Sequence, residues 1–173
     1  MEKTSYITTT LPYVNDVPHM GHALEFVHAD IIARWKRICD NDVFFNTGTD
    51  EHGVKIYKKA QEVGIDPIDY TEQYAAHFKE LLKKLHISEH NFIRTTDEDH
   101  KKAAQAFWML CNKNGDIYKK EYKIKYCIGC ELEKTDSELI DNKCSVHPNL
   151  EIEIIEEENY FFRLSNYQER LLK

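Results

Sequence analysis

The chain has 173 residues, of which 42% are hydrophobic and 31% are charged, and its formal net charge is −7. This length suits one domain with its own core, with or without a small insertion. No apolar run approaches the roughly 20 residues that span a bilayer, and no signal-peptide pattern is present. We therefore expect a cytoplasmic protein with no membrane partner. Phosphate backbones are bound by clustered Lys and Arg, so the acidic balance argues against a large nucleic-acid footprint on this chain.

Patterns typical of strands and helices alternate over residues 1–115, as in an α/β fold with a parallel sheet. Residues 6–11 and 42–47 are aromatic and β-branched, the composition of buried strands. Between them, apolar residues recur at helical spacing, and we expect them to form the buried face of a helix: Leu24, Val27, Ile31, Trp35 and Ile38.

The same alternation continues beyond the second strand. We expect a helix over residues 54–63 that ends at Gly64, and a second helix from Asp66-Pro67 to about residue 86. Residues 91–95 have the composition of a third strand. Thr96 and Asp99 have the spacing of a capping box, with Asp in place of Glu or Gln, for a helix that ends near residue 115.

The pattern changes near residue 116. Residues 122–126 and 151–154 alternate polar and apolar side chains, as half-exposed antiparallel strands do, and residues 159–163 resemble an aromatic strand. We expect the acidic run 156–158 to be a solvated turn. These patterns predict three regions: an α/β part over 1–115, a small β-rich insertion over 116–160, and a return segment with the start of a helix over 161–173.

Four residues of the insertion have the spacing of a zinc knuckle. Cys127 and Cys130 form C-x2-C, and after 13 residues Cys144 and His147 form C-x2-H. Two such short knuckles suit tetrahedral Zn²⁺, and four protein ligands leave no open position for a substrate. An odd number of cysteines in a chain expected in the cytoplasm also favours a metal or free thiols over disulfides. We therefore expect one structural zinc ion, bound between residues 127 and 147.

The loop between the first strand and the first helix has the features of an anion site. It contains His19, Gly21 and His22 immediately before the helical pattern. Free N–H groups and the positive end of the helix dipole favour a phosphate at such a helix start. The histidines add donors, and glycine lets a ligand approach the backbone. A short polar loop with solvated histidines is the ordinary alternative.

Asp50 follows the second strand, at the edge where parallel sheets bind ligands. If the first two strands are neighbours, this carboxylate lies near the histidine loop and can accept an ammonium group from a small substrate. Helix capping or solvation is the alternative role for a single Asp in a polar loop.

Five segments carry recognisable motifs: 11–15 (LPYVN), 19–22 (HMGH), 48–53 (GTDEHG), 92–96 (FIRTT) and 159–163 (NYFFR). Together with the zinc knuckle, they resemble the N-terminal part of the methionyl-tRNA synthetases, a family of class I aminoacyl-tRNA synthetases. The likeness covers essentially the whole chain. Met20 departs mildly from the first signature, which usually has an aliphatic residue there. The leucyl, isoleucyl and valyl enzymes share that signature, but we would expect a larger insertion in them.

The resemblance implies the first half of a Rossmann-like sheet with a zinc-binding connective insertion, and an ATP-dependent methionine–tRNA ligase activity. The partners would be methionine, ATP with Mg²⁺, and tRNA(Met). By the family's pattern, His19 and His22 are catalytic, and five residues bind ATP: His19, Gly21, His22, Asn15 and Glu25. The residues that bind methionine would be Leu11, Tyr13 and Asp50.

The sequence has no K-M-S-K-S-like signature and no pattern like an anticodon-binding domain. We therefore expect this chain alone to be inactive, with most tRNA contacts made elsewhere. Two other functions stay open, namely another H-x-G-H nucleotidyltransferase and a non-catalytic zinc-ribbon binding module.

Overall fold

The computed structural model describes residues 3–88 and 90–173. The chain forms two compact units, of which the first ends at Lys102 and the second begins at Ala103. The division expected between residues 115 and 116 stays a prediction. Among the described residues, no helix is long and apolar enough to cross a membrane.

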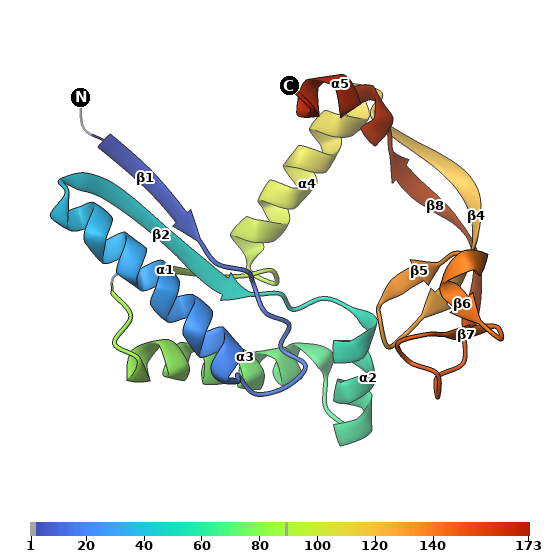
Figure 1. The fold of residues 1–173 in the computed structure, drawn as a ribbon, viewed down its shortest axis with the longest axis horizontal. Coiled ribbons are helices and arrows are strands. Elements are labelled where there is room, and N and C mark those ends of the chain that lie inside the picture. The colour runs from blue at the N-terminus through green and yellow to red at the C-terminus, as the bar shows by residue number, and fades with distance from the viewer. Residues whose placement is uncertain (1–2, 89) are drawn as a thin grey trace. The chain divides into compact units, whose positions relative to one another are not determined.

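The first unit contains the expected parallel sheet (Figure 1), and the α/β prediction is confirmed. Its strands lie in the order β1 (Lys3–Thr8), β2 (Asn41–Thr49) and β3 (Asn91–Arg94). β1 ends earlier than the expected strand over residues 6–11, because the chain leaves the sheet after Thr8 and begins the loop that leads to the first helix.

The helices begin and end where local signals place them. They are α1 (Met20–Ile38), α2 (Val54–Val63), α3 (Pro67–Lys84) and α4 (Glu98–Lys113). α2 stops at Gly64, whose φ of 74° is the left-handed conformation that glycine adopts without strain. The Asp66 carboxylate caps α3 by accepting a hydrogen bond from the backbone N–H of Ile68.

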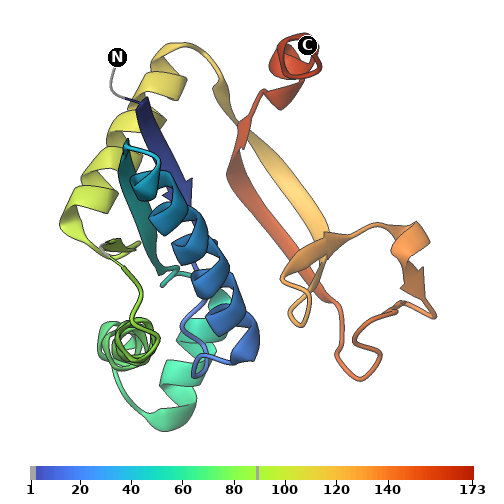
Figure 2. The same ribbon diagram turned by 60° about the vertical axis from the view of Figure 1, so that its left-hand side comes forward.

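The buried face of α1 is not the one expected from the sequence. Leu24, Ile31 and Trp35 are each 57% exposed, and Ile38 is 80% exposed. The helix instead lies against one face of β1 and β2 (Figure 2), and its buried residues are Ala23, Phe26, Ala29, Asp30 and Ala33. Small alanine side chains let the helix approach the sheet closely, whereas hydropathy alone favours the bulkier stripe.

The larger core of the first unit lies beside the loop that follows β1. Val14, in that loop, is fully buried and packs in one cluster with Phe26 of α1, Ile56 of α2, and Phe78 and Leu82 of α3. Burying a valine side chain contributes about 1.5–3 kcal/mol. The loop is therefore anchored by its own apolar residue, although most of its neighbours are polar.

The second unit is β-rich, as expected. β4 (Ile117–Cys127) pairs antiparallel with both β5 (Leu132–Lys134) and β8 (Glu153–Phe162). β6 (Leu139–Ile140) pairs with β7 (Lys143–Cys144), and the short helices are η1 (Asp136–Glu138), η2 (Leu164–Tyr167) and α5 (Gln168–Leu171).

One detail of the sequence prediction is wrong here. The acidic run 156–158 lies inside β8, where Glu156 and Glu158 form ion pairs with Lys123 and Lys119 of β4. Cross-strand charge pairs of this kind stabilise a sheet. In the first unit, the expected capping box is wrong as well. α4 begins at Glu98, so Thr96 is not its N-cap residue, and the Thr96 hydroxyl donates to the carboxylate of Glu51.

Candidate active site and metal centre

The loop from β1 to α1 ends in two histidines that cap the helix. His19 is the N-cap residue, and its Nδ1 accepts a hydrogen bond from the backbone N–H of Gly21 at 3.1 Å. Nδ1 of His22 accepts the backbone N–H of His19 at 3.2 Å, so the pair forms a reciprocal capping box. The two rings are stacked, with 3.8 Å between their centroids.

These bonds determine where each imidazole carries its proton. An Nδ1 that accepts a hydrogen bond must be unprotonated, so the N–H of each neutral ring is at Nε2. Burial lowers the pKa of His22, and the neighbouring His19 lowers it further. The neutral form is therefore favoured at His22. The arrangement leaves two Nε2–H donors at the positive end of a 19-residue helix.

Three elements hold the loop in place. The carboxylate of Glu25, in α1, accepts both the backbone N–H and the hydroxyl of Thr10 at 2.7 Å. The backbone N–H of Asp50 donates to Pro12 at 2.9 Å, and that of Val14 donates to Asp50 at 3.4 Å. From α3, the hydroxyl of Tyr70 donates to the carbonyl of Asn15 at 3.1 Å. These contacts hold the loop at Thr10, at residues 12–14 and at Asn15.

Asp50 lies directly beside the loop, because β1 and β2 are neighbours. It forms an isolated parallel bridge with Tyr13 just beyond the paired strands. The side chain of Tyr13 is exposed, whereas Asp50 and Leu11 are half-buried. Oδ1 of Asp50 accepts weak hydrogen bonds, each of 3.4 Å, from the Thr95 hydroxyl and the backbone N–H of His52. The roles expected for Leu11, Tyr13 and Asp50 remain predictions.

Sequence reasoning missed a buried ion pair next to Asp50. The side chain of Glu51 is 0% exposed, and its two carboxylate oxygens accept Nε and an Nη of Arg94 at 2.7 and 2.9 Å. The hydroxyls of Thr49 and Thr96 also donate to it. These contacts raise the pKa of Arg94, so the guanidinium stays charged. The pair joins the carboxyl ends of β2 and β3, and sequence spacing gives no sign of it.

The four expected metal ligands converge in the second unit. One ligand atom from each of Cys127, Cys130, Cys144 and His147 lies within 4.8 Å of the others. The Cys130 and Cys144 sulfurs are 3.5 Å apart, too far for a disulfide, and His147 Nδ1 lies 3.2 Å from Cys130 Sγ and 3.8 Å from Cys127 Sγ. A tetrahedral ion with metal–sulfur bonds of about 2.3 Å holds its sulfurs about 3.8 Å apart. The cluster therefore has the size of a zinc site.

Two local features favour metal binding. Although burial acts to raise the pKa of Cys144, hydrogen bonds from the backbone N–H groups of His147 and Val146 lower it to about 6, whereas burial raises the pKa of the neighbouring Cys130 to about 11. A thiolate is the form of cysteine that binds metals. At Gly129, a Cβ would lie 2.5 Å from Cγ of His147, so only glycine lets the imidazole reach the knuckle.

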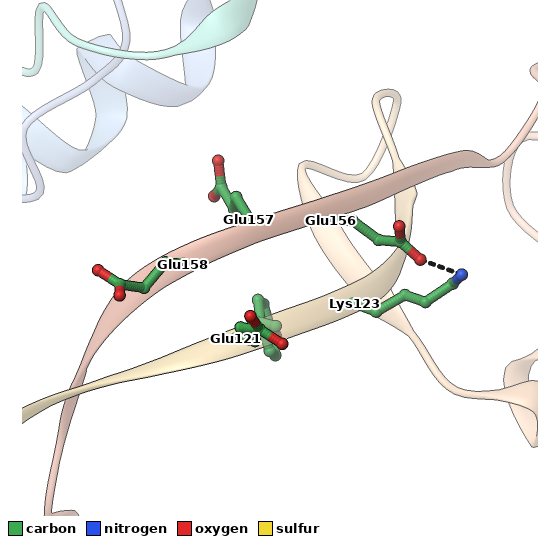
Figure 3. A pocket seen from close by; sticks show the side chains of 6 residues that line it. Glu121, Lys123, Glu156, Glu157 and Glu158 are labelled. Atoms are coloured by element: carbon green, nitrogen blue, oxygen red, sulfur yellow. Dashed lines mark ion pairs between the residues drawn. The ribbon is translucent and has the colours of Figure 1, made fainter.

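A further hollow lies on the β4–β8 ribbon (Figure 3). Its volume is about 480 Å³, and it is lined by Glu121, Tyr122, Lys123, Glu156, Glu157 and Glu158. Lys123 and Glu156 form an ion pair across it, and both side chains are more than 60% exposed. Acidic side chains open to solvent in this way are typical of a charged strand face. None of the residues expected in the active site lines this hollow.

Comparisons with known proteins agree with this arrangement. The family model described as tRNA synthetases class I (M) matches residues 5–173. Methionine–tRNA ligases of Thermotoga maritima and Rickettsia bellii are 47% and 44% identical to the chain over 97% and 100% of its length. The chain covers 27% and 34% of these two relatives, so it spans about a third or less of their length.

The fold is also similar to that of a solved structure. Mycobacterium tuberculosis methionyl-tRNA synthetase in complex with methionyl-adenylate matches 98% of the chain with a TM-score of 0.90 and 39% identity, and the match covers 34% of that protein. The family model extends over both units and over every candidate site residue described above. The chain belongs to the family of class I tRNA synthetases (M).

Proposed function

We propose that the chain forms the first part of the methionine-activating site of a methionine–tRNA ligase. One observation carries this proposal: the bridge between Tyr13 and Asp50 brings a carboxylate next to a loop that ends in two histidine donors. A carboxylate suits the ammonium group of an amino acid, and a helix start with two Nε2–H donors suits the phosphates of ATP. The similar proteins named above include one solved with methionyl-adenylate.

In the proposed reaction, the methionine carboxylate attacks the α-phosphorus of ATP, and pyrophosphate leaves. His19, Gly21 and His22 bind the phosphates, with Asn15 and Glu25 beside them, and Mg²⁺ accompanies ATP as part of the substrate. Little covalent chemistry is required of the protein, so positioning and stabilisation of phosphate charge supply most of the rate. Transfer of methionine to tRNA(Met) follows in the complete enzyme, in the cytoplasm.

Asp50 holds the ammonium group of methionine, and Leu11 and Tyr13 line the pocket for its side chain. An apolar and aromatic wall suits a polarisable thioether. The pocket discriminates methionine from shorter aliphatic amino acids by a difference in binding free energy of about 1–3 kcal/mol per methylene. The Thr95 hydroxyl, which donates to Oδ1 of Asp50 at 3.4 Å, helps to orient this carboxylate.

Zinc is the metal that we assign to Cys127, Cys130, Cys144 and His147. Three thiolates and an imidazole fill a tetrahedral shell, so the ion has a structural role. The two fully buried side chains of the insertion are Cys127 and Cys144, at 0% and 1% exposure. Metal–ligand bonds therefore take the place of an apolar core there.

The test uses a complete ligase that carries this chain. Asp50→Asn removes the charge that faces the ammonium group, and we expect the KM for methionine to rise about 10- to 100-fold in ATP–pyrophosphate exchange. Asp42→Asn is the matched control, since Asp42 is an exposed carboxylate at the opposite end of the same strand. Equal methionine KM values for the two variants would contradict the proposed role of Asp50.

A further inference from the structure

Tyr70 is a buried tyrosine whose hydroxyl reaches from α3 to the loop between β1 and α1. The residue is 2% exposed, and it belongs to the core cluster that contains Val14 and Phe78. Its hydroxyl donates to the carbonyl of Asn15 at 3.1 Å, across 55 positions of sequence. Burying a hydroxyl costs free energy unless the group is hydrogen-bonded. The packed ring places the Tyr70 hydroxyl, and the carbonyl of Asn15 is the partner that it needs there.

The hydroxyl of Tyr70 stays protonated and can therefore donate a hydrogen bond. Burial raises the pKa of Tyr70, and the neighbouring Tyr74 and the charge of Asp16 raise it further. The two tyrosine rings are stacked at 4.4 Å, which limits their movement. Tyr70 therefore presents a protonated hydroxyl to the loop over the whole physiological pH range.

The hydrogen bond from Tyr70 to Asn15 acts on the part of the loop that leads to α1. Residues 12–14 are held by the backbone of Asp50, at the side assigned to methionine. Asn15 comes after that bridge, and the chain then leads to His19 at the start of α1. A contact at the Asn15 carbonyl therefore fixes the segment that carries the phosphate donors, while the Tyr13–Asp50 bridge is held independently.

We infer that Tyr70 is a positioning residue for ATP, an inference that rests on the proposed function. From α3, its hydroxyl holds the segment from Asn15 to His19 in the conformation that receives the phosphates. It touches no reacting atom and acts through the backbone of Asn15. Removing the hydroxyl should weaken the binding of ATP and leave the binding of methionine unchanged.

The experiment compares Tyr70→Phe with Tyr57→Phe in a complete ligase that carries this chain. Both changes remove one tyrosine hydroxyl and keep the ring, but the Tyr57 hydroxyl accepts from Gln61 within α2. We expect Tyr70→Phe to raise the KM for ATP about three- to tenfold, the effect of one lost hydrogen bond. The KM for methionine should stay within about twofold of the wild-type value.

Hydrogen exchange gives a second measurement on the same variants. We expect faster exchange of the backbone amides of residues 15–22 in Tyr70→Phe, with residues 41–49 unchanged. An equal rise in the KM for both substrates would mean a general loss of structure and would overturn the inference. An ATP KM within about twofold of wild type would overturn it as well.

A third variant separates this inference from the proposed function. If His22→Ala impairs ATP use while Tyr70→Phe does not, the phosphate site stands and the role of Tyr70 is wrong. If His22→Ala has no effect on ATP use either, the proposed phosphate site itself is wrong, and the inference fails with it.

Discussion

The ion pair between Glu51 and Arg94 offers the sharpest test of how the edge of the sheet is held together. The carboxylate of Glu51 is fully buried and the side chain of Arg94 is 13% exposed. Arg94→Met keeps an unbranched apolar stem and removes the guanidinium with its charge. Glu51 then retains the hydroxyls of Thr49 and Thr96 but loses its counter-charge.

The burial of Glu51 determines how much stability Arg94→Met loses. Removing one partner of a buried ion pair costs about 3–5 kcal/mol, because the other charge stays buried and unpaired. The double variant Glu51→Gln/Arg94→Met buries no charge. The two threonine hydroxyls donate to different oxygens of Glu51, so in glutamine the amide oxygen can accept from one threonine and the NH2 group can donate to the hydroxyl of the other. We therefore expect the double variant to be more stable than Arg94→Met by about 1–3 kcal/mol.

Urea denaturation of the zinc-loaded chain, followed by circular dichroism, measures these free energies of unfolding. The control is Lys59→Met, which removes an exposed ion pair with Glu62 within α2 and should cost less than about 1 kcal/mol. The reasoning would be refuted if Arg94→Met cost no more than this control. A double variant less stable than Arg94→Met would show that the unpaired charge is not the source of the loss.

Two further predictions concern the metal centre and the histidine cap. Gly129→Ala places a Cβ 2.5 Å from the His147 ring, so we expect less than about half an equivalent of zinc by elemental analysis after metal loading, against about one for the unchanged chain. The lowered pKa of His22 means that the unfolded chain takes up this proton first as the pH falls. The contribution of His22 to stability is therefore complete above about pH 6.5 and is lost below it. His22→Gln should flatten the fall in the free energy of unfolding between pH 6.5 and 5, and an unchanged slope would contradict this.

Local chemistry predicted the end of α2 and the start of α3. Gly64 ends α2 and Asp66 caps α3, and each depends only on residues within one turn. The four metal ligands are also predictable from local spacing, because each C-x2-C or C-x2-H knuckle is formed by neighbouring residues. Neighbouring parallel strands bring Asp50 beside the loop, and a sequence with alternating strands and helices predicts such neighbours.

Features that depend on packing between distant elements were missed. α1 has two faces of apolar residues, and the sequence cannot tell that the sheet selects Ala29 and Ala33 over Ile31 and Trp35. The Glu51–Arg94 pair joins residues 43 positions apart, and neither residue carries a pattern that marks it as buried. Both cases depend on which surfaces of the fold pack together. The periodicity within one helix or strand does not carry that information.

The loop before α1 shows how a polar segment can be held in one conformation. Its donors lie at an exposed helix start, where apolar packing alone would leave them mobile. Instead, Glu25 holds Thr10, the backbone of Asp50 holds residues 12–14, and Tyr70 holds Asn15, so three elements each fix a different point. Donors that are already oriented need no rearrangement when charge develops on a phosphate. These anchors limit the movement of the loop, so substitutions at them test the proposed phosphate site as directly as substitutions at the histidines.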